Sequence, residues 1–293
     1  MCVGVIDGFI RITDSEFASI SSLVYEKTGI RLTEQKKTLV ETRLGKLLRQ
    51  LGFENFGQYY DYVLADTSGE AISLLIEKVS TNHSYFFRES DHFDYLVETV
   101  LPPLVEQKKA AGDRTLRIWC AGCAGGEESY TLAMLLQEFF GPEIVTWDIG
   151  ILATDISIGA LNKACEGVYA PEKLHVVPDA CRKTYFKEQE DGRFRVIDKL
   201  KDMILFKHLN LMEFPYPFKN RFDVVFCRNV MIYFDAASRI EAVANIADVM
   251  HAGSYLFIGH SESLGRQSTM LQYIKPAVYC RLPGAVVRGV SNG

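Results

Sequence analysis

The sequence has no long uninterrupted apolar run, and its first residues lack the basic-then-apolar order of a secretory signal. A transmembrane helix needs about 20 mostly apolar residues in succession, and a signal peptide needs a charged start before its apolar stretch. Neither is present in this chain, which begins Met1-Cys2-Val3-Gly4-Val5-Ile6-Asp7. We therefore expect a cytoplasmic protein with no direct membrane insertion.

An excess of basic charge is also missing. The chain holds 32 Lys and Arg residues against 37 Asp and Glu residues, which gives a net charge of −5. A protein that binds nucleic acid needs a basic face to neutralise phosphates, so we expect no nucleic-acid partner. The 48% of apolar residues and 24% of charged residues are ordinary for a globular protein.

The seven cysteines lack the pattern of a disulfide framework or a zinc site. Their number is odd and they are scattered, as is usual for reduced thiols in a cytosol. Cys120 and Cys123 form a CxxC, but no second CxxC or HxxxH follows at zinc spacing. We interpret them as small residues that let the backbone approach a ligand, with redox chemistry as the minor alternative. The spacing of His83, His92 and His260 does not indicate a metal site either, so we expect structural histidines and no metal.

Apolar residues recur at helical spacing from about Thr13 to Lys78. A first helix begins at a capping sequence near Asp14, a second begins at Thr33, and two shorter ones span about 55–65 and 69–79. The sequence therefore predicts an all-α domain over residues 1–80.

Basic residues gather in the second of these helices. Between Arg31 and Arg49 there are six basic residues against two acidic ones. A solvated helix face is the more common explanation of such a run. The functional alternative is a docking surface for an acidic helix of a partner protein. Its residues would be Lys36, Lys37, Arg43, Lys46 and Arg49.

After about Leu101 short apolar strands alternate with amphipathic helices. We expect strands at 117–120, 148–154, 204–207, 222–227, 255–258 and 278–281, and helices at 127–140, 158–165 and 236–250. This alternation predicts an α/β domain with a doubly wound parallel sheet over residues 104–293, joined to the helical domain by a linker over 81–103. Residues 167–205 interrupt it, and the turn signal Asp191-Gly192 there predicts an inserted β-hairpin.

Polar residues follow the ends of the expected strands, where open α/β sheets bind ligands. Asp155 ends the second strand and is placed to accept hydrogen bonds from ribose hydroxyls; capping the next helix is the alternative. Asn210-Leu211 follows the third strand, in the position expected to edge an adenine. Arg228-Asn229 follows the fourth, and it either forms a wall of the site or caps a helix.

A Gly-rich loop, Ala121–Glu128, joins the first strand to a helix whose N-terminus offers free N–H groups. The dinucleotide-binding fingerprint requires glycine at three positions of such a loop. This chain has glycine at the first of them, Gly122, but Ala124 and Glu127 at the other two. Glutamates at the helix start would repel a pyrophosphate and suit a cationic amino group. The loop therefore favours S-adenosylmethionine over NAD.

These motifs, together with the segment Ser80–Glu89, closely resemble those of the chemotaxis receptor methyltransferases, the CheR-type protein-glutamate O-methyltransferases. The resemblance covers nearly the whole chain. The motifs that carry it are Phe86-Phe87-Arg88, Gly126-Glu127-Glu128-Ser129-Tyr130, Thr154-Asp155-Ile156, the run from Cys227 to Phe234, and Gly259-His260-Ser261-Glu262.

The resemblance implies an S-adenosylmethionine-dependent, Rossmann-like methyltransferase domain with an inserted β-subdomain, preceded by an all-α domain that helps to bind the receptor. It implies transfer of methyl groups to glutamates in the cytoplasmic helices of chemoreceptors, with docking by the basic helix. Such a glutamate is already ionised at neutral pH, so no strong general base is needed. Nothing in the sequence indicates an obligate dimer, and we expect a monomer.

The resemblance also assigns residues of the site. The implied cofactor-binding residues are Asn82, Ser84, Arg88, Glu127, Glu128, Asp155, Asn210, Leu211, Arg228 and Asn229. One of the two glutamates would hold the methionine amino group; Glu128 is slightly favoured, and the choice between them stays open. Arg88 and Tyr233 are the implied catalytic residues, with Tyr233 near the reactive methyl.

The turn between Phe186 and Arg193 is short for those family members that use the hairpin to grip a pentapeptide at the receptor C-terminus. We therefore expect an enzyme that does not depend on such a tether. The alternatives are a non-catalytic module that senses S-adenosylmethionine or acts as a scaffold, and a methyltransferase with another protein acceptor.

Overall fold

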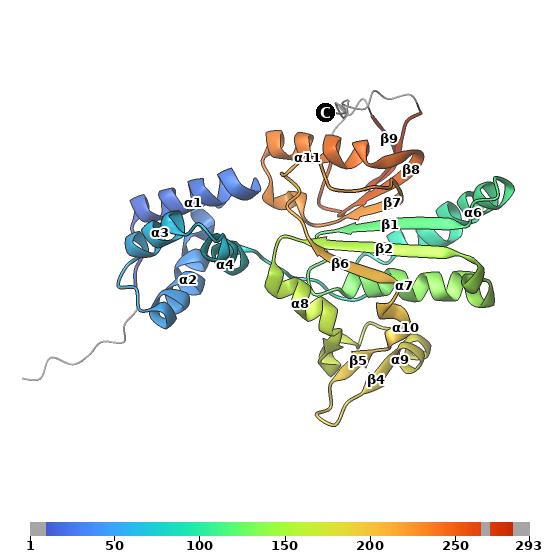
Figure 1. Cartoon of the computed structure of the whole chain (residues 1–293), viewed down its shortest axis with the longest axis horizontal. Helices are drawn as coiled ribbons and strands as arrows, with labels where there is room; N and C mark the ends of the chain where they lie inside the picture. Colours follow the sequence, from blue (N-terminus) through green and yellow to red (C-terminus); the bar gives the residue numbers. More distant parts are fainter. Residues whose placement is uncertain (1–9, 265–269, 284–293) are drawn as a thin grey trace, which may run out of the picture. The chain divides into compact units, whose positions relative to one another are not determined.

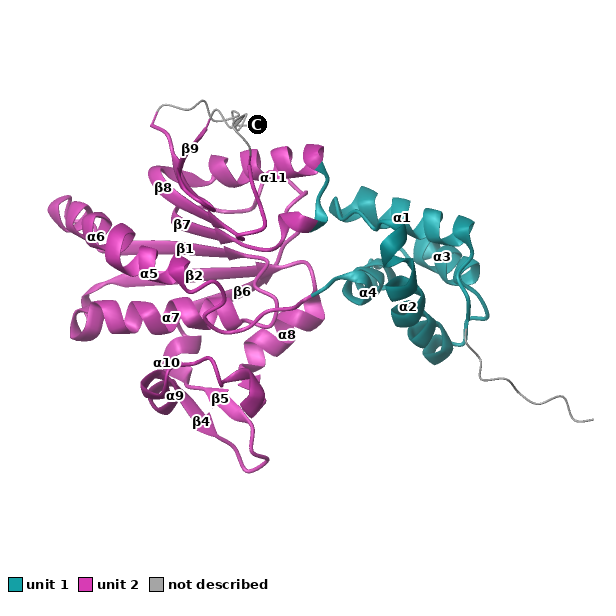
Figure 2. Ribbon diagram, turned by 180° about the vertical axis from the view of Figure 1, so that it is seen from behind, with its two compact units in different colours: residues 1–81, 233–235 teal, residues 82–232, 236–293 magenta. Residues whose placement is uncertain are grey.

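The computed structural model describes residues 10–264 and 270–283. It divides the chain into two compact units, Met1–Thr81 with Tyr233–Asp235, and Asn82–Ile232 with Ala236–Gly293 (Figure 2). Within the described residues no helix is long and apolar enough to cross a membrane. The N-terminal segment that the sequence analysis took as lacking a signal, including Cys2, lies outside the described residues.

The first unit is all-α, as predicted. It contains α1 (Asp14–Thr28), the short 3₁₀ helix η1 (Glu34–Lys36), α2 (Lys37–Leu51), α3 (Phe56–Ala65) and α4 (Glu70–Val79). Helix α1 begins with a capping box between Thr13 and Glu16 and ends at Gly29, whose φ of 69° suits glycine. The helices bury one apolar cluster, which includes Phe17, Ile20, Val24, Leu44, Leu48, Phe56, Tyr59 and Leu75.

A short segment from far along the chain completes this unit. The Arg31 backbone N–H donates to the Tyr233 carbonyl at 2.9 Å, and Ile30 forms an antiparallel bridge with Phe234. The Tyr25 hydroxyl donates to Asp235 Oδ2 at 2.7 Å. Residues 233–235 are therefore part of the helical unit, although they follow a strand of the second unit in sequence.

The second unit is built on a seven-stranded sheet of order β6-β2-β1-β7-β8-β10-β9 (Figure 1). The strands are β1 (Thr115–Ala121), β2 (Asp148–Asp155), β6 (Ile204–His208), β7 (Phe222–Cys227), β8 (Met250–Ile258), β9 (Leu271–Lys275) and β10 (Val278–Arg281). The first five in the order are parallel, whereas β10 runs antiparallel to both of its neighbours. The sequence analysis missed β9 and expected a purely parallel sheet, so the observed sheet is mixed.

Helices α7 (Glu127–Phe140), α8 (Ile158–Glu166) and α11 (Ala236–Asp248) occupy the predicted connections, and η3 (Gly141–Thr146) and η5 (Met231–Tyr233) are short 3₁₀ turns. The expected linker over 81–103 contains a helix that the sequence analysis missed: α5 (Asp91–Tyr95), a π-helical turn η2 (Leu96–Val100) and α6 (Leu101–Ala110). Phe93 of α5 stacks on Phe226 of β7, which stacks on Phe257 of β8, so this helix packs against the sheet.

The interruption at 167–205 is an inserted subdomain, as predicted. Strands β3 (Val168–Tyr169), β5 (Phe194–Val196) and β4 (Phe186–Glu188) form a small antiparallel sheet in that order. The predicted hairpin is its β4–β5 pair, with Gly192 at a φ of 77° in the turn. The 3₁₀ turn η4 (Pro171–Lys173) and the short helices α9 (Asp179–Tyr185) and α10 (Asp198–Lys201) complete it, and in Figure 1 it lies below α7.

The strand order defines where a ligand is expected. Strand β1 pairs with β2 on one side and with β7 on the other, so the chain winds in opposite directions from β1. Open α/β sheets bind ligands outside the carboxyl ends of the strands at such a switch point. The loops that follow β1, β2, β6, β7 and β8 meet this edge, which we call the carboxyl edge.

Candidate functional site

The Gly-rich loop after β1 is tied to the neighbouring strands. The backbone N–H groups of Gly122 and Cys123 donate to the Thr154 carbonyl at 2.7 and 2.9 Å. Gly122 has a φ of 87°, and a Cβ added there would lie 2.3 Å from Val230 Cγ2. Only glycine fits this close approach, which brings the loop against the segment that follows β7.

Asp155 lies under this loop and is only 7% exposed. Its Oδ2 accepts from the Ala124 backbone N–H at 2.8 Å, and its Oδ1 accepts from that of Ser157 at 2.8 Å. Ser157, and not Asp155, caps α8, so the capping alternative for Asp155 was wrong. Burial raises the pKa of Asp155, although the backbone N–H groups act in the opposite direction. The carboxylate still has lone pairs left for a ligand.

Glu127 opens α7 and is 3% exposed. Its Oε1 lies 3.0 Å from Lys173 Nζ, but its Oε2 has no hydrogen-bond partner among the described residues. A Cβ added to Gly125 would lie 2.8 Å from that free oxygen, so glycine leaves it space. A buried carboxylate oxygen without a partner is costly, and a cationic ligand group would satisfy it.

Lys173 comes from the inserted subdomain, and the sequence analysis did not assign it to the site. Its ammonium also donates to the Ser84 carbonyl at 2.8 Å, so it links Glu127 to the Ser84 backbone. The side chain of Ser84 is not involved in this bond. No sequence motif pointed to Lys173, because its partners lie 46 and 89 positions away.

Arg228 and Glu128 form the charged centre of the carboxyl edge. The Arg228 side chain is 1% exposed, with Nη1 3.1 Å from Glu128 Oε2 and Nη2 3.0 Å from Glu89 Oε2. Its guanidinium also lies 5.1 Å from the centre of the Phe93 ring. Burial raises the pKa of Glu128, and the charge of Arg228 opposes that effect. Arg228 therefore does not cap a helix; it joins the end of β7 to α7 and the segment before α5.

Glu89 is a second residue that the sequence analysis missed. Its carboxylate contacts Arg228, accepts from Asn229 Nδ2 at 3.2 Å and from the His260 backbone N–H at 3.2 Å, and lies 3.9 Å from Arg88 Nε. Three expected cofactor-binding residues, Arg88, Arg228 and Asn229, thus contact one carboxylate. Its place directly after the Phe86-Phe87-Arg88 motif was the available signal.

The segments after β7 and β8 are locked together by Glu262. Its carboxylate accepts backbone N–H bonds from Asn229 at 2.9 Å, Ile232 at 3.0 Å and Gly259 at 2.6 Å. Burial raises the pKa of Glu262 despite these bonds. A Cβ on Gly259 would lie 2.4 Å from Asn229 Nδ2, which explains glycine there. Asn229, at a φ of 58°, is held between the two segments.

The remaining expected cofactor residues lie around this centre with less direct contact. Asn82 is exposed, and Arg88 Nη1 donates to the His83 carbonyl at 3.0 Å. Asn210 is buried in the turn after β6, where its Oδ1 accepts from the Met212 N–H at 3.1 Å. Leu211 beside it is also buried. Asn210 therefore shapes the turn that would edge a ligand.

Tyr233 and the basic helix belong to the helical unit. The ring of Tyr233 lies 5.6 Å from Lys36 Nζ, and its catalytic role stays a prediction. Lys37 pairs with Asp14, and Arg43 Nη1 donates to the Ser80 carbonyl at 2.6 Å. Arg43 thus holds the end of α4 rather than presenting a free charge.

The two cysteines of the CxxC motif are free thiols inside the protein. Burial raises the pKa of both Cys120 and Cys123 well above the usual range of a thiol. Cys120 Sγ donates to Glu128 Oε1 at 2.9 Å. Because the thiolate is the reactive form, these protonated thiols do not favour the redox alternative.

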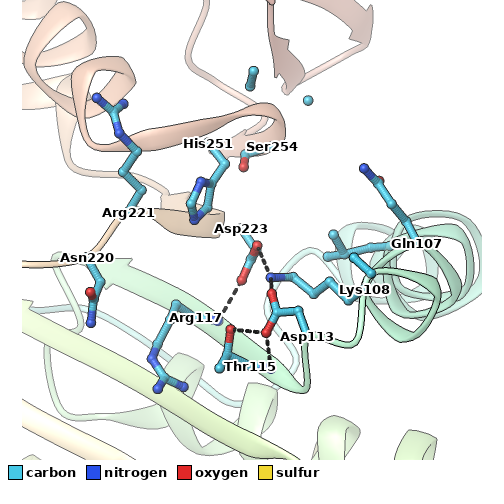
Figure 3. A pocket seen from close by; sticks show the side chains of 14 residues that line it. Gln107, Lys108, Asp113, Thr115, Arg117, Asn220, Arg221, Asp223, His251 and Ser254 are labelled. Atoms are coloured by element: carbon cyan, nitrogen blue, oxygen red, sulfur yellow. Dashed lines mark hydrogen bonds and ion pairs between the residues drawn. The ribbon is translucent and has the colours of Figure 1, made fainter.

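A cavity of about 540 Å³ lies at the opposite, amino edge of the sheet (Figure 3). It is lined from α6 and from the starts of β1, β7 and β8, with Lys108, Asp113, Arg117, Asp223 and His251 among its residues. Lys108 lies between the carboxylates of Asp113 and Asp223, at 3.0 and 2.9 Å. None of the expected site residues lines this cavity.

Comparisons with known proteins identify similar chains. A family model described as CheR methyltransferase, SAM binding domain, matches residues 82–280, and one described as CheR methyltransferase, all-alpha domain, matches residues 15–80. The chain is 44% identical over 270 residues to a chemotaxis protein methyltransferase of Borreliella burgdorferi, covering 92% of this chain and 95% of that protein. It is 32% identical over 257 residues to a chemotaxis protein methyltransferase of Escherichia coli, covering 87% and 86%.

Proposed function

The chain belongs to the CheR methyltransferase family, as the sequence resemblance predicted, and on this basis we propose that it methylates glutamate side chains of chemotaxis receptors. The family match supports S-adenosylmethionine-dependent methyl transfer in chemotaxis. The proposal adds the acceptor: glutamates in the cytoplasmic helices of the receptors, converted to glutamyl methyl esters.

The proposal that the chain binds S-adenosylmethionine rests on the Oε2 atom of Glu127 at the Gly-rich loop, which has no hydrogen-bond partner among the described residues. This oxygen suits the cationic amino group of the methionine moiety, whereas Glu128 is already paired with Arg228. This favours Glu127 over Glu128 as the residue that holds the amino group. Asp155 would hold the ribose, and the turn at Asn210 would edge the adenine.

When bound, S-adenosylmethionine supplies an activated methyl group on a sulfonium centre. The residues of the chain then have to align the acceptor and exclude water, and neither task requires a general base. Arg88, on the segment before α5, is proposed to orient the acceptor carboxylate through a charge-assisted hydrogen bond. The hydroxyl of Tyr233 is proposed to position an acceptor oxygen.

Docking on the receptor is proposed to use the exposed part of the basic helix. Lys46 and Arg49 are exposed and lie three positions apart on α2, so they share one face. Lys46→Glu with Arg49→Glu should raise the KM for receptor about fivefold or more and leave the cofactor Kd unchanged. Lys199→Glu, which alters an exposed lysine of the inserted subdomain, is the control. An unchanged KM in the double variant would remove this surface from the proposal.

Independence from a receptor tether is supported by the β4–β5 turn. The Gln189 N–H donates to the Arg193 carbonyl at 2.7 Å, and Arg193 Nε pairs with Asp191 Oδ2 at 2.7 Å. The turn is therefore closed by its own residues. Deleting the last five residues of a receptor should leave its methylation rate unchanged, and a large loss of rate would refute this part.

The experiment that tests the function is methyl transfer from labelled S-adenosylmethionine to membranes that carry chemoreceptors, followed by mild base. Label on a receptor band that base releases as methanol is the expected result. Membranes without receptors are the control. Cofactor binding by calorimetry without any label transfer would indicate a sensing module or another acceptor, and no binding would overturn the cofactor site.

Tyr233→Phe tests the catalytic assignment separately. Loss of one hydroxyl that positions the acceptor should lower kcat about tenfold, as expected for a hydrogen bond worth about 1–2 kcal/mol. The cofactor Kd should stay the same. A higher Kd with an unchanged kcat would show that Tyr233 has no such role.

A further inference from the structure

Two histidines and a glutamate that are far apart in sequence meet at the carboxyl edge. Glu89 lies two residues before α5, His92 lies in the first turn of α5, and His260 follows β8. One donor atom from each side chain lies within 4.8 Å of the others. His92 Nδ1 is 3.7 Å from Glu89 Oε2, and the rings of His92 and His260 are 4.6 Å apart between centres.

His92 is the unusual member of this group. Its side chain is fully buried, and neither ring nitrogen has a hydrogen-bond partner among the described residues. A buried polar atom without a partner costs about 1–3 kcal/mol, so native structures rarely leave one. The ring packs 5.6 Å from that of Phe257, which fixes its position beside Glu89 and His260.

We propose that Glu89, His92 and His260 bind one divalent transition-metal ion of the zinc type. Two imidazoles and one carboxylate are a donor set that zinc accepts, with bonds of about 2.0–2.2 Å. The three donor atoms must draw together by about 1 Å to reach those lengths. The His260 side chain is 46% exposed, which leaves it free to make that movement.

The surroundings support an imidazole ligand at His260. Its Nε2 lies 3.1 Å from an oxygen of Asp91. A carboxylate that accepts from one ring nitrogen is the usual partner of a metal-binding histidine, because it leaves the other nitrogen for the ion.

The charge balance also allows a dication. Arg228 Nη2 lies 3.0 Å from Glu89 Oε2, and its Nη1 lies 3.1 Å from Glu128. Arg88 Nε lies 3.9 Å from Glu89 Oε1. The three carboxylates of Glu89, Asp91 and Glu128 thus face two guanidinium groups, which leaves one negative charge for the ion. The metal would tie α5 to the segment after β8, and the proposal does not depend on the methyl acceptor.

The test uses the full-length, tag-free protein and zinc chloride, with binding followed by calorimetry and elemental analysis. We expect one zinc ion per chain. His260→Ala should weaken binding at least tenfold, whereas His175→Ala, which removes an exposed histidine of the inserted subdomain, should leave the affinity unchanged. Absence of stoichiometric zinc binding to the wild-type protein would overturn the proposal.

A second variant and a second metal guard against misfolding and against binding elsewhere. His92→Phe keeps a ring beside Phe257 but removes both nitrogens, so it should fold and lose zinc affinity about as much as His260→Ala. Cobalt in the wild-type protein should give visible bands without the charge-transfer absorption of a thiolate. Wild-type affinity in both histidine variants, or a thiolate band, would assign the ion to other residues and refute the site.

Discussion

Each edge of the large sheet holds a cation between two carboxylates. At the carboxyl edge Arg228 lies between Glu89 and Glu128. At the amino edge Lys108 lies between Asp113 and Asp223, as Figure 3 shows. By charge and by burial of the cation the two arrangements are similar, with 1% of the Arg228 side chain and 12% of the Lys108 side chain exposed.

The two edges differ in what remains unsatisfied. At the amino edge Asp223 Oδ2 also accepts from the Arg117 N–H at 2.8 Å, and Asp113 Oδ1 accepts from Thr115 Oγ1 at 2.7 Å. At the carboxyl edge Glu127 Oε2 and both ring nitrogens of His92 have no partner among the described residues. Arg281 Nε, beside the start of β8, is also without a partner among the described residues, so the contrast holds for the carboxylates of the two edges and not for every polar atom. The cavity lies at the amino edge, where both carboxylates are paired with Lys108.

The pKa shifts of the carboxylates follow the same division only in part. Burial raises the pKa of Asp155, Glu128 and Glu262 at the carboxyl edge. At Glu89 burial is outweighed by the charge of Arg228 and by hydrogen bonds from Asn229 and Arg228, which lower its pKa. At the amino edge hydrogen bonds from Thr115, and then Lys108, lower the pKa of Asp113 to about 2. A buried carboxylate has lost its contact with water, so a cation that binds next to it stabilises its ionised form the most. We therefore expect Asp155 and Glu128 at the carboxyl edge to gain more from a cationic ligand than Asp113 at the amino edge.

Arg228→Met should have the largest effect, because it breaks the network at the carboxyl edge. The variant leaves Glu89 and Glu128 buried without their shared cation, which should cost about 3–5 kcal/mol of unfolding free energy. Urea unfolding monitored by circular dichroism measures it. A loss below about 1 kcal/mol would mean that these carboxylates are protonated or solvated, and the contrast between the edges would fail.

Asp155→Ala tests whether the carboxyl edge binds the cofactor. Removing a carboxylate that accepts hydrogen bonds from the ligand should raise the Kd for S-adenosylmethionine about 10- to 100-fold. Asp155→Asn keeps the shape of the side chain and one oxygen that can accept a hydrogen bond from the loop. It therefore separates the effect of a changed loop structure on the Kd from the effect of the lost charge. Calorimetry measures the Kd for S-adenosylmethionine in both variants. Wild-type affinity in the alanine variant would exclude Asp155 from the site.

Much of the fold could be predicted from the sequence because its signals are local. Apolar runs and helical periodicity predicted the principal strands and helices, and Asp191-Gly192 predicted the hairpin. The helix over 91–110 was missed because Pro102-Pro103 suggested a break in the chain. These prolines lie in the first turn of α6, directly after the π-helical turn η2, which interrupts the α-helical hydrogen bonds before them.

From the sequence we could predict only those site residues that lie at the ends of individual strands. Their positions indicated Asp155, Arg228 and Asn229, because parallel strands bring their carboxyl ends together. The partners were not predictable from spacing, since Glu89 and Asn229 are 140 positions apart. His92 and His260 are likewise far apart in sequence, so their spacing could not indicate the metal site proposed above.

Lys108→Met is the matched variant at the amino edge. It leaves Asp223 without its ion pair but still bonded to the Arg117 N–H, so we expect a loss of about 1–3 kcal/mol in unfolding free energy. The Kd for S-adenosylmethionine should not change. Comparing this variant with Arg228→Met tests the difference between the two edges of the sheet. A changed Kd in the lysine variant would show that the amino edge contributes to ligand binding.

Asp113→Asn should have the smallest effect and a distinct pH dependence. The pKa of Asp113 is lowered to about 2, so its stabilising contribution is present above the unfolded pKa of 3.8 and is lost as the pH falls toward 2. Its side chain is 40% exposed, and solvent screening should limit the contribution to about 1 kcal/mol or less. Unfolding midpoints from pH 7 to pH 2 should therefore converge for the variant and the wild type below pH 4. A difference that persists unchanged at pH 2 would show that the asparagine alters packing around Thr115 and Lys108 rather than removing a charge.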